Sequence, residues 1–210
     1  SNNQLLASGD TLTVDDSSIS AASVSVGWGY SVYQITASLA TPAAWSSISY
    51  SGKTVYWGID FKSMTDTLLT FANGSKLLVG DNAAGTAADD GANTLNGTSG
   101  SDQILGLGGD DSLTGGAGDD VFFLGYQSNA VGNDTVSGGD GNDWLSFNSN
   151  STAPATVSMV THNASSTQGS VAFTSIEKVS GTAAADTLTG GDSAHGLDTL
   201  GNRTSEVFRG

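Results

Sequence analysis

The stretch from Gly97 to Phe123 decides the fold of this chain. Written in blocks of nine, it reads GTSGSDQIL (97–105), GLGGDDSLT (106–114) and GGAGDDVFF (115–123). Each block has glycine at its first and fourth positions, aspartate at its sixth and a large apolar residue at its eighth. The acids are Asp102, Asp111 and Asp120, and the apolar residues are Ile104, Leu113 and Phe122. A fixed period of this kind predicts a repeating structure.

Each part of the repeat has a physical role. Glycines at fixed offsets allow a turn through positive φ and let backbone carbonyls approach one point. The residues after each aspartate read as a short strand with one side chain pointing inward, because strand side chains alternate between faces. A flexible Gly/Asp loop would not need an apolar residue in phase with every acid. We therefore interpret the stretch as alternating turns and strands.

These blocks resemble the nonapeptide G-G-x-G-x-D-x-U-x of RTX proteins, which are secreted bacterial proteins. The resemblance implies a parallel β-roll in which two nonapeptides form one coil, so that turns stack at every second repeat. Carbonyl and aspartate oxygens of stacked turns then form an all-oxygen cage, which suits Ca²⁺. We expect several Ca²⁺ ions, with Asp120 sharing one with the turn of Asp143. Asp111 is expected to share one with the turn of Asn93 or of Asp134.

Weaker repeats extend the motif on both sides. The nonad 88–96 carries asparagine in place of aspartate, 129–137 is degenerate and 138–146 is complete. A second block from residue 181 is weaker still, and a strand without a metal remains an alternative there. The candidate metal ligands are Asn93, Asp102, Asp111, Asp120, Asp134, Asp143, Asp186 and Asp198, with Gly97, Gly100, Gly106, Gly109, Gly115, Ala117, Gly118, Gly138, Asp140 and Gly141.

The charge balance supports a role for divalent cations. The 210 residues include 21 acidic and 6 basic side chains, giving a net charge of −15, and there is no cysteine. No Lys or Arg lies between Lys76 and Lys178. Such a segment repels itself unless cations neutralise it. It is also a poor nucleic-acid binder, because phosphate recognition needs basic side chains.

We expect an all-β chain of four segments. Residues 1–80 read as a small antiparallel β domain that caps the roll, with strands at 11–14, 23–26, 31–36 and 46–49. Hairpins are predicted at Ser51-Gly52 and, from the Asn-Gly pair, at Asn73-Gly74. Residues 81–146 are the first roll block, 147–180 a β excursion with strands at 156–160 and 171–179, and 181–210 the second block.

Two stretches outside the nonads invite a functional interpretation. Trp28, Trp45 and Trp57 would suit a sugar-stacking platform, but a small domain poor in Leu and Met needs aromatic residues for its core, and we favour the core. TSIEKVSG (174–181) resembles the T-S-I-E-N-V-x-G segment that re-enters RTX rolls. Lys178 replaces the usual Asn, which leaves the strand expected and the local hydrogen bonding open.

Catalytic motifs are missing from the sequence. There is no H-E-x-x-H, no G-x-S-x-G and no cysteine nucleophile, and His162 and His195 are isolated in polar surroundings. The acid pairs Asp110-Asp111 and Asp119-Asp120 follow from the repeat, in which the second acid is the ligand. We therefore expect a protein that is not an enzyme.

The prediction is an extracellular or cell-surface bacterial protein, exported by type I secretion, that folds on Ca²⁺ binding. No N-terminal signal peptide and no recognisable C-terminal signal are present. We expect a structural or self-assembling role, as in an S-layer, filament or adhesin, with contacts through the open ends of the roll. The alternative is a carbohydrate-binding or secretion and folding module of a larger secreted enzyme or toxin. Cell-surface polysaccharide is a further candidate partner; a membrane span is not expected.

Overall fold

The regular secondary structure of the described residues is almost entirely β-strand. The computed structural model describes residues 5–6, 12–31, 43–51, 53–57, 69–80, 91–124, 131–147, 153–190, 196–197 and 205–207. Within them the only helical element is a short 3₁₀ helix, η1 (Ala21–Ser23). No helix in these ranges has the length and apolarity needed to cross a membrane. The predicted all-β fold is confirmed.

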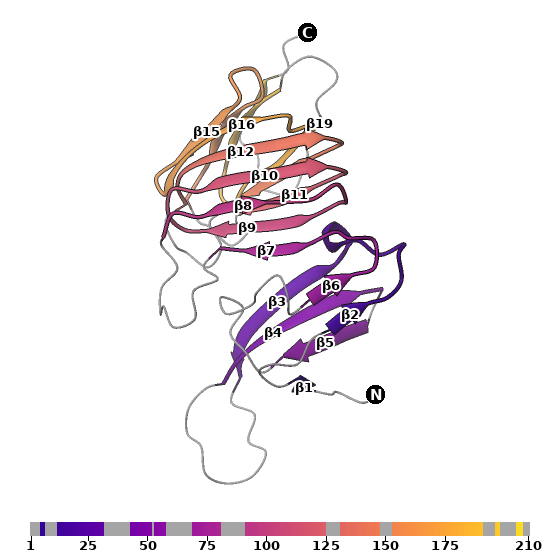
Figure 1. The fold of residues 1–210 in the computed structure, drawn as a ribbon. Coiled ribbons are helices and arrows are strands. Elements are labelled where there is room, and N and C mark those ends of the chain that lie inside the picture. Colours follow the sequence, from indigo (N-terminus) through magenta and orange to yellow (C-terminus); the bar gives the residue numbers. More distant parts are fainter. Residues whose placement is uncertain are drawn as a thin grey trace.

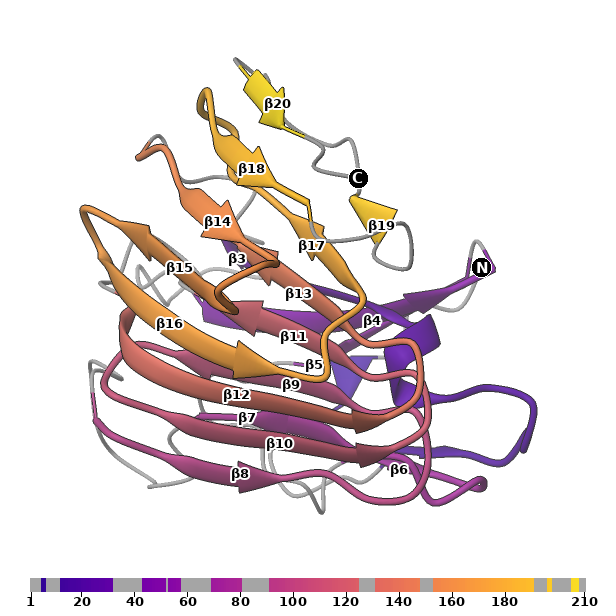
Figure 2. The same cartoon turned by 90° about the horizontal axis from the view of Figure 1, so that it is seen from above.

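The nonads form a roll with two walls, and the chain passes from one wall to the other and back (Figure 2). The first wall is a sheet of six strands in which every neighbouring pair is parallel. Its strands, in sheet order, are β7 (Leu77–Val79), β9 (Gln103–Leu107), β11 (Val121–Leu124), β13 (Trp144–Phe147), β17 (Lys178–Ser180) and β19 (Gly196–Leu197).

The second wall is a sheet of eight strands (Figure 1). In sheet order they are β8 (Thr94–Asn96), β10 (Ser112–Ala117), β12 (Gly132–Asp140), β16 (Gly169–Thr174), β15 (Asn163–Ser166), β14 (Thr156–Ser158), β18 (Thr187–Thr189) and β20 (Ser205–Val207). Consecutive nonads lie in opposite walls, so each coil contains two of them. The second block, from residue 181, contributes the strands β18, β19 and β20.

The apolar residue of each nonad fills the space between the walls. Phe122 is fully buried and lies in register with Ile104 on one side and Leu145 on the other. Leu95, Leu113 and Val136 occupy the same position in the other wall and belong to the same core cluster. One inward side chain per strand is what the repeat predicts, and these side chains form the main core.

The segment after β13 contains one strand that was not predicted, and the strand expected at 171–179 is divided into β16 and β17, which lie in different walls. We expected strands at 156–160 and 171–179 joined by a polar loop, but part of that loop is β15, antiparallel to both β14 and β16. The sequence did not predict β15 because three of its four residues are polar. Ala164 alone is buried while Asn163 and Ser165 are exposed, which is the alternation of a strand with one wet face.

The N-terminal region forms a separate four-stranded sheet, distinct from the two walls. Its strands, in sheet order, are β1 (Leu5–Leu6), β5 (Lys53–Trp57), β4 (Ala43–Tyr50) and β3 (Ser25–Ser31). β4 and β5 make the predicted hairpin, and Ser51 at its tip has φ 48°. Residues 32–36 and the side chains of Trp28, Trp45 and Trp57 lie outside what the structure describes. The sugar-stacking platform therefore remains a prediction from the sequence alone.

The predicted hairpin at Asn73-Gly74 is wrong. A turn exists there, with Gly74 at φ 83° and its N–H donating to the Phe71 carbonyl at 3.0 Å. However, β6 (Leu69–Phe71) pairs in parallel with β2 (Leu12–Val14), while β7 joins the roll beside β9. The Lys76 N–H donates to the carboxylate of Asp102, which holds the start of β7 against the roll instead of against β6.

A second apolar cluster joins the N-terminal region to the outer face of the six-stranded wall. Ala21, Val24, Leu69 and Phe71 pack with outward-facing side chains of β7 and β9. Those side chains are Leu77, Val79, Leu105 and Leu107. The contact therefore lies on the side of the first coils, where Figure 1 places the N-terminal strands next to β7.

Candidate metal centre

Every strong nonad places its aspartate at the start of a strand and buries it. Within the described ranges six such carboxylates are at most 3% exposed: Asp102, Asp111, Asp120, Asp134, Asp143 and Asp186. Taking a carboxylate out of water is costly unless hydrogen bonds or a cation compensate. The surroundings of these six side chains therefore decide what the roll can do.

One oxygen of each carboxylate binds the backbone of the coil before it. Asp120 Oδ1 accepts the Asp102 N–H at 2.8 Å, and Asp143 Oδ1 accepts the Asp120 N–H at 2.8 Å. In the other wall, Asp134 Oδ1 accepts the Asp111 N–H at 2.9 Å. The acids therefore form two ladders, one for each wall, and consecutive nonads contribute to opposite ladders as predicted.

The first ladder ends on a residue that the sequence did not assign to the site. The Asp143 N–H donates to Glu177 Oε2 at 2.8 Å. Glu177 precedes β17 as Asp143 precedes β13, so it takes the aspartate position of the next coil. Its place before the short strand Lys178–Ser180 was the available signal. That strand is confirmed, and the Lys178 N–H donates to the Asp143 carbonyl at 2.9 Å.

The second carboxylate oxygen has no hydrogen-bond donor in the turns of Asp120 and Asp143. Asp120 Oδ2 and Asp143 Oδ2 are buried and accept no hydrogen bond. A buried acceptor without a donor costs about 1–3 kcal/mol, and more when it carries charge. These two oxygens of one ladder are therefore available as ligands for a cation.

The motif glycines keep side chains away from these two oxygens. A Cβ on Gly115 would overlap both Asp120 Oδ2 and the carbonyl oxygen of Gly138 in the next coil. A Cβ on Gly138 would overlap Asp143 Oδ2 and the carbonyl oxygen of Ser175. In each case a carboxylate of one turn and a carbonyl of the next meet where a side chain would otherwise stand.

The donor set fits a hard cation. Among the described residues, no three Asp, Glu, His or Cys side chains gather around one point. Backbone carbonyls would therefore have to supply most of the ligands beside one or two carboxylates. Oxygen-only coordination of this kind suits Ca²⁺ and not a soft metal.

Comparison with known families agrees with this chemistry. The family model of the RTX calcium-binding nonapeptide repeat matches four copies in the chain, within residues 88–122, 131–150 and 173–194. The chain carries RTX calcium-binding repeats. The matched residues include the turns that end at Asp102, Asp111, Asp120, Asp143 and Asp186. No curated protein and no solved structure matches the chain.

The remaining predicted ligands of the RTX roll hold the coils together through their backbones. Asn93 donates its backbone N–H to Asp111 Oδ1 at 2.8 Å and its side-chain Nδ2 to the Gly91 carbonyl at 2.7 Å. The fourth-position glycines let neighbouring coils touch, since a Cβ on Gly118 would meet the backbone of Gly100 and one on Gly141 that of Gly118. Of the other predicted ligands, Asp140 is exposed, and Asp198 lies outside the described residues.

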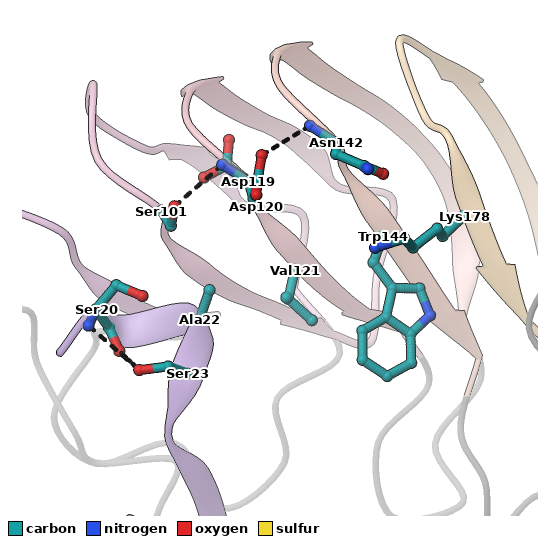
Figure 3. Close-up of a pocket in the computed structure, with 10 residues that line it drawn as sticks. All are labelled: Ser20, Ala22, Ser23, Ser101, Asp119, Asp120, Val121, Asn142, Trp144 and Lys178. Carbon is teal, nitrogen blue, oxygen red and sulfur yellow. Dashed lines mark hydrogen bonds between the residues drawn. The ribbon is translucent and has the colours of Figure 1, made fainter. Parts of the chain in front are cut away.

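The neighbouring acids form an outer ladder on the surface of the RTX roll. Asp119 accepts the Asn142 N–H at 3.0 Å through Oδ1, and its own N–H donates to Ser101 Oγ at 3.0 Å. Figure 3 shows these bonds along one side of a groove of about 250 Å³. Trp144 lines the same groove, and its Nε1 donates to Ser180 Oγ at 3.0 Å.

The buried carboxylates of the ladders have raised pKa values when no cation is present. Burial raises the pKa of Asp120 to about 7, and the charges of neighbouring repeat acids add to this rise. Burial likewise raises the pKa of Asp134 to about 7 and that of Asp143 to about 6. These pKa values lie above the value of 3.8 expected for an exposed aspartate.

At pH 6, where protonated carboxylates still stabilise the calcium-free roll, calcium binding is expected to release protons, and at pH 8 it is not. Raised pKa values stabilise the calcium-free roll below about pH 4, and this contribution is lost as pH rises toward 7. Calcium must displace these protons, so its affinity should increase between pH 5 and 7. Titration calorimetry in two buffers of different ionisation enthalpy measures the protons released. Equal release at pH 6 and pH 8 would contradict the assignment.

Proposed function

We propose that this chain is an extracellular calcium-binding β-roll protein that folds on binding Ca²⁺ after export by a type I system. We further propose a structural or self-assembling role at the bacterial surface, and no catalytic one. The proposal is supported above all by Asp120 Oδ2 and Asp143 Oδ2, buried oxygens that face carbonyls of the next coil and accept no hydrogen bond.

Charge explains why folding would wait for calcium. The ladders stack carboxylates on successive coils, and no Lys or Arg stands between Lys76 and Lys178 to balance them. A chain with this charge is extended in a calcium-poor cytoplasm, and millimolar external calcium neutralises it. The same cation would then control both export competence and the folded state.

The repeat acids serve the ladders, which favours a structural role over catalysis. The adjacent carboxylates of Asp119 and Asp120 accept the N–H groups of Asn142 and Asp102, in the coils on either side of them. His162 is exposed at a turn and contacts the ring of Phe173 at a centroid distance of 6.0 Å. Neither arrangement pairs a nucleophile with a base.

Self-association would use the edges of the two walls. Among the described strands, β7 and β8 end the walls on one side and β19 and β20 on the other. Edges of this kind present backbone groups that another chain can pair with. The N-terminal strands β1 and β2 are paired elsewhere, β1 with β5 and β2 with β6. We propose an edge-to-edge contact between walls instead.

A second candidate function is binding of cell-surface polysaccharide, as a module of a larger secreted protein. The groove in Figure 3 favours it, because half-buried Trp144 lines it together with the polar residues Ser101, Asn142 and Lys178. An aromatic face with polar neighbours suits a sugar ring. Glycan binding that is lost on Trp144→Ala, with the fold unchanged, would distinguish this role from assembly.

Calcium removal tests the main proposal. In chelator we expect circular dichroism of the full chain to show little β structure from the roll, and 5 mM Ca²⁺, on the order used by extracellular modules, to restore it. Light scattering on the same samples reports assembly. Mg²⁺ at the same concentration is the control, since its strict octahedral preference fits a carbonyl cage poorly. A full β spectrum in chelator would rule out calcium-driven folding, and a monomer in calcium would rule out assembly.

A further inference from the structure

Four turns of the roll fall into two classes that differ at the second position of the nonad. In two turns this residue is threonine, Thr98 before Asp102 and Thr182 before Asp186. In the two central turns it is glycine, Gly116 before Asp120 and Gly139 before Asp143. The carboxylates of the two classes have different surroundings although all four are buried.

The threonine turns satisfy their carboxylate with protein groups alone. Thr98 donates its backbone N–H to Asp102 Oδ2 and its hydroxyl to the same carboxylate at 3.1 Å. Thr182 repeats this, with its N–H to Asp186 Oδ2 at 2.7 Å and its hydroxyl to Oδ1 at 2.8 Å. Each Oδ1 also accepts a backbone N–H from the preceding coil, that of Lys76 or of Ala155.

The glycine turns cannot make this bond, because their backbone runs differently. Gly116 has φ 117° and Gly139 has φ 111°, a region that threonine rarely adopts, and neither Thr98 nor Thr182 has positive φ. Asp120 Oδ2 and Asp143 Oδ2 are the two oxygens of these turns that accept no hydrogen bond. The choice of residue at the second position thus decides whether a protein donor reaches Oδ2.

We propose that threonine at this position takes the place of the cation. Of these four turns, Gly97–Asp102 and Gly181–Asp186 hold their carboxylates without calcium, whereas Gly115–Asp120 and Gly138–Asp143 require it. This inference rests on the proposed calcium-binding function and assigns it to particular turns.

The threonine turn at 97–102 is also stabilised by contacts with the N-terminal region that involve no metal ligand. The Ala22 N–H donates to the Ser101 carbonyl at 3.2 Å, and the Ala21 N–H to Ser75 Oγ at 2.8 Å. Gly100 packs directly on Ser75, where a Cβ would sit at 3.3 Å. The first complete coil is therefore fixed to η1 and to the β6–β7 turn. It provides a calcium-independent start from which the calcium-dependent coils extend.

Hydrogen exchange of the full chain tests the inference. In chelator, amides of residues 97–107 are expected to stay protected while those of 115–124 and 138–147 exchange at least about tenfold faster, and calcium should protect all three. Residues 97–107 exchanging as fast as 115–124 in chelator would overturn it. This comparison needs no variant and so does not depend on a mutant folding.

Calcium stoichiometry of two matched variants provides the second test. Asp120→Asn should lose about one ion, whereas Asp102→Asn should bind as many ions as the wild type in saturating calcium. Equal loss in the two variants contradicts the inference. A wild-type chain that binds no calcium would overturn the proposed function, while the exchange experiment would still decide whether the threonine turns hold without a cation.

Discussion

Replacing Gly115 with alanine is expected to destroy one cation site and to destabilise the calcium-loaded roll by about 2–3 kcal/mol. The new methyl group would overlap Asp120 Oδ2 and the Gly138 carbonyl oxygen. Neither can retreat freely, because the Asp120 carboxylate is held through Oδ1 by the Asp102 N–H and Gly138 lies within β12. The backbone of Gly115 itself has no positive φ, so the effect is steric. Calcium titration should show one ion fewer, and chemical unfolding in saturating calcium should show the lost stability.

Gly91→Ala is the matched control for this variant. No atom lies within 4 Å of the position that its Cβ would occupy, and the residue is exposed. It should change neither the stoichiometry nor the free energy of unfolding by more than about 0.5 kcal/mol. If Gly115→Ala behaved like this control, the space beside Asp120 would not be the cation site.

Phe122→Ala is expected to give the largest loss of stability, about 3–5 kcal/mol. The ring is fully buried at the centre of the roll, between Ile104 and Leu145, and its removal leaves a cavity that the parallel ladders on both sides prevent from collapsing. A domain of ordinary stability would lose much of its margin. Denaturant unfolding in saturating calcium measures the change.

Val160→Ala is the control for the core variant. Val160 is 57% exposed in the turn between β14 and β15, so the same kind of truncation there should be close to neutral. A Phe122→Ala roll as stable as this control would mean that the inward position of the nonad does not carry the core.

The roll could be predicted from the sequence because its period repeats one physical unit. The phase of Phe122 with Asp120 fixes which side chain points inward, and the spacing fixes which turns stack. Elements without such a period were harder. β7 is three residues long and follows an Asn-Gly pair, and only long-range contacts, its pairing with β9 and the bond of Lys76 to Asp102, place it in the roll.

The candidate site was predictable as a set of positions but not as a set of roles. The sequence places Asp102 and Asp120 at the same position of the motif, and only the hydrogen bonds of Thr98 separate them. Glu177 was missed because it stands outside a nonad and is longer than aspartate. The sequence shows Thr98 and Thr182 at the second position of the motif. Their role as donors to the carboxylate became clear only by comparison with the backbone angles of Gly116 and Gly139.

The antiparallel pair β14 and β15 has a consequence for how such proteins can lengthen in evolution. β14 and β15 stand between β16 and β18 in one wall, with backbone pairing on every side, while the opposite wall continues directly from β13 to β17. An insertion can therefore widen one wall by two strands without breaking the ladder that Asp143 and Glu177 continue in the other. A family built this way can acquire new surface one hairpin at a time and keep its ion-binding register.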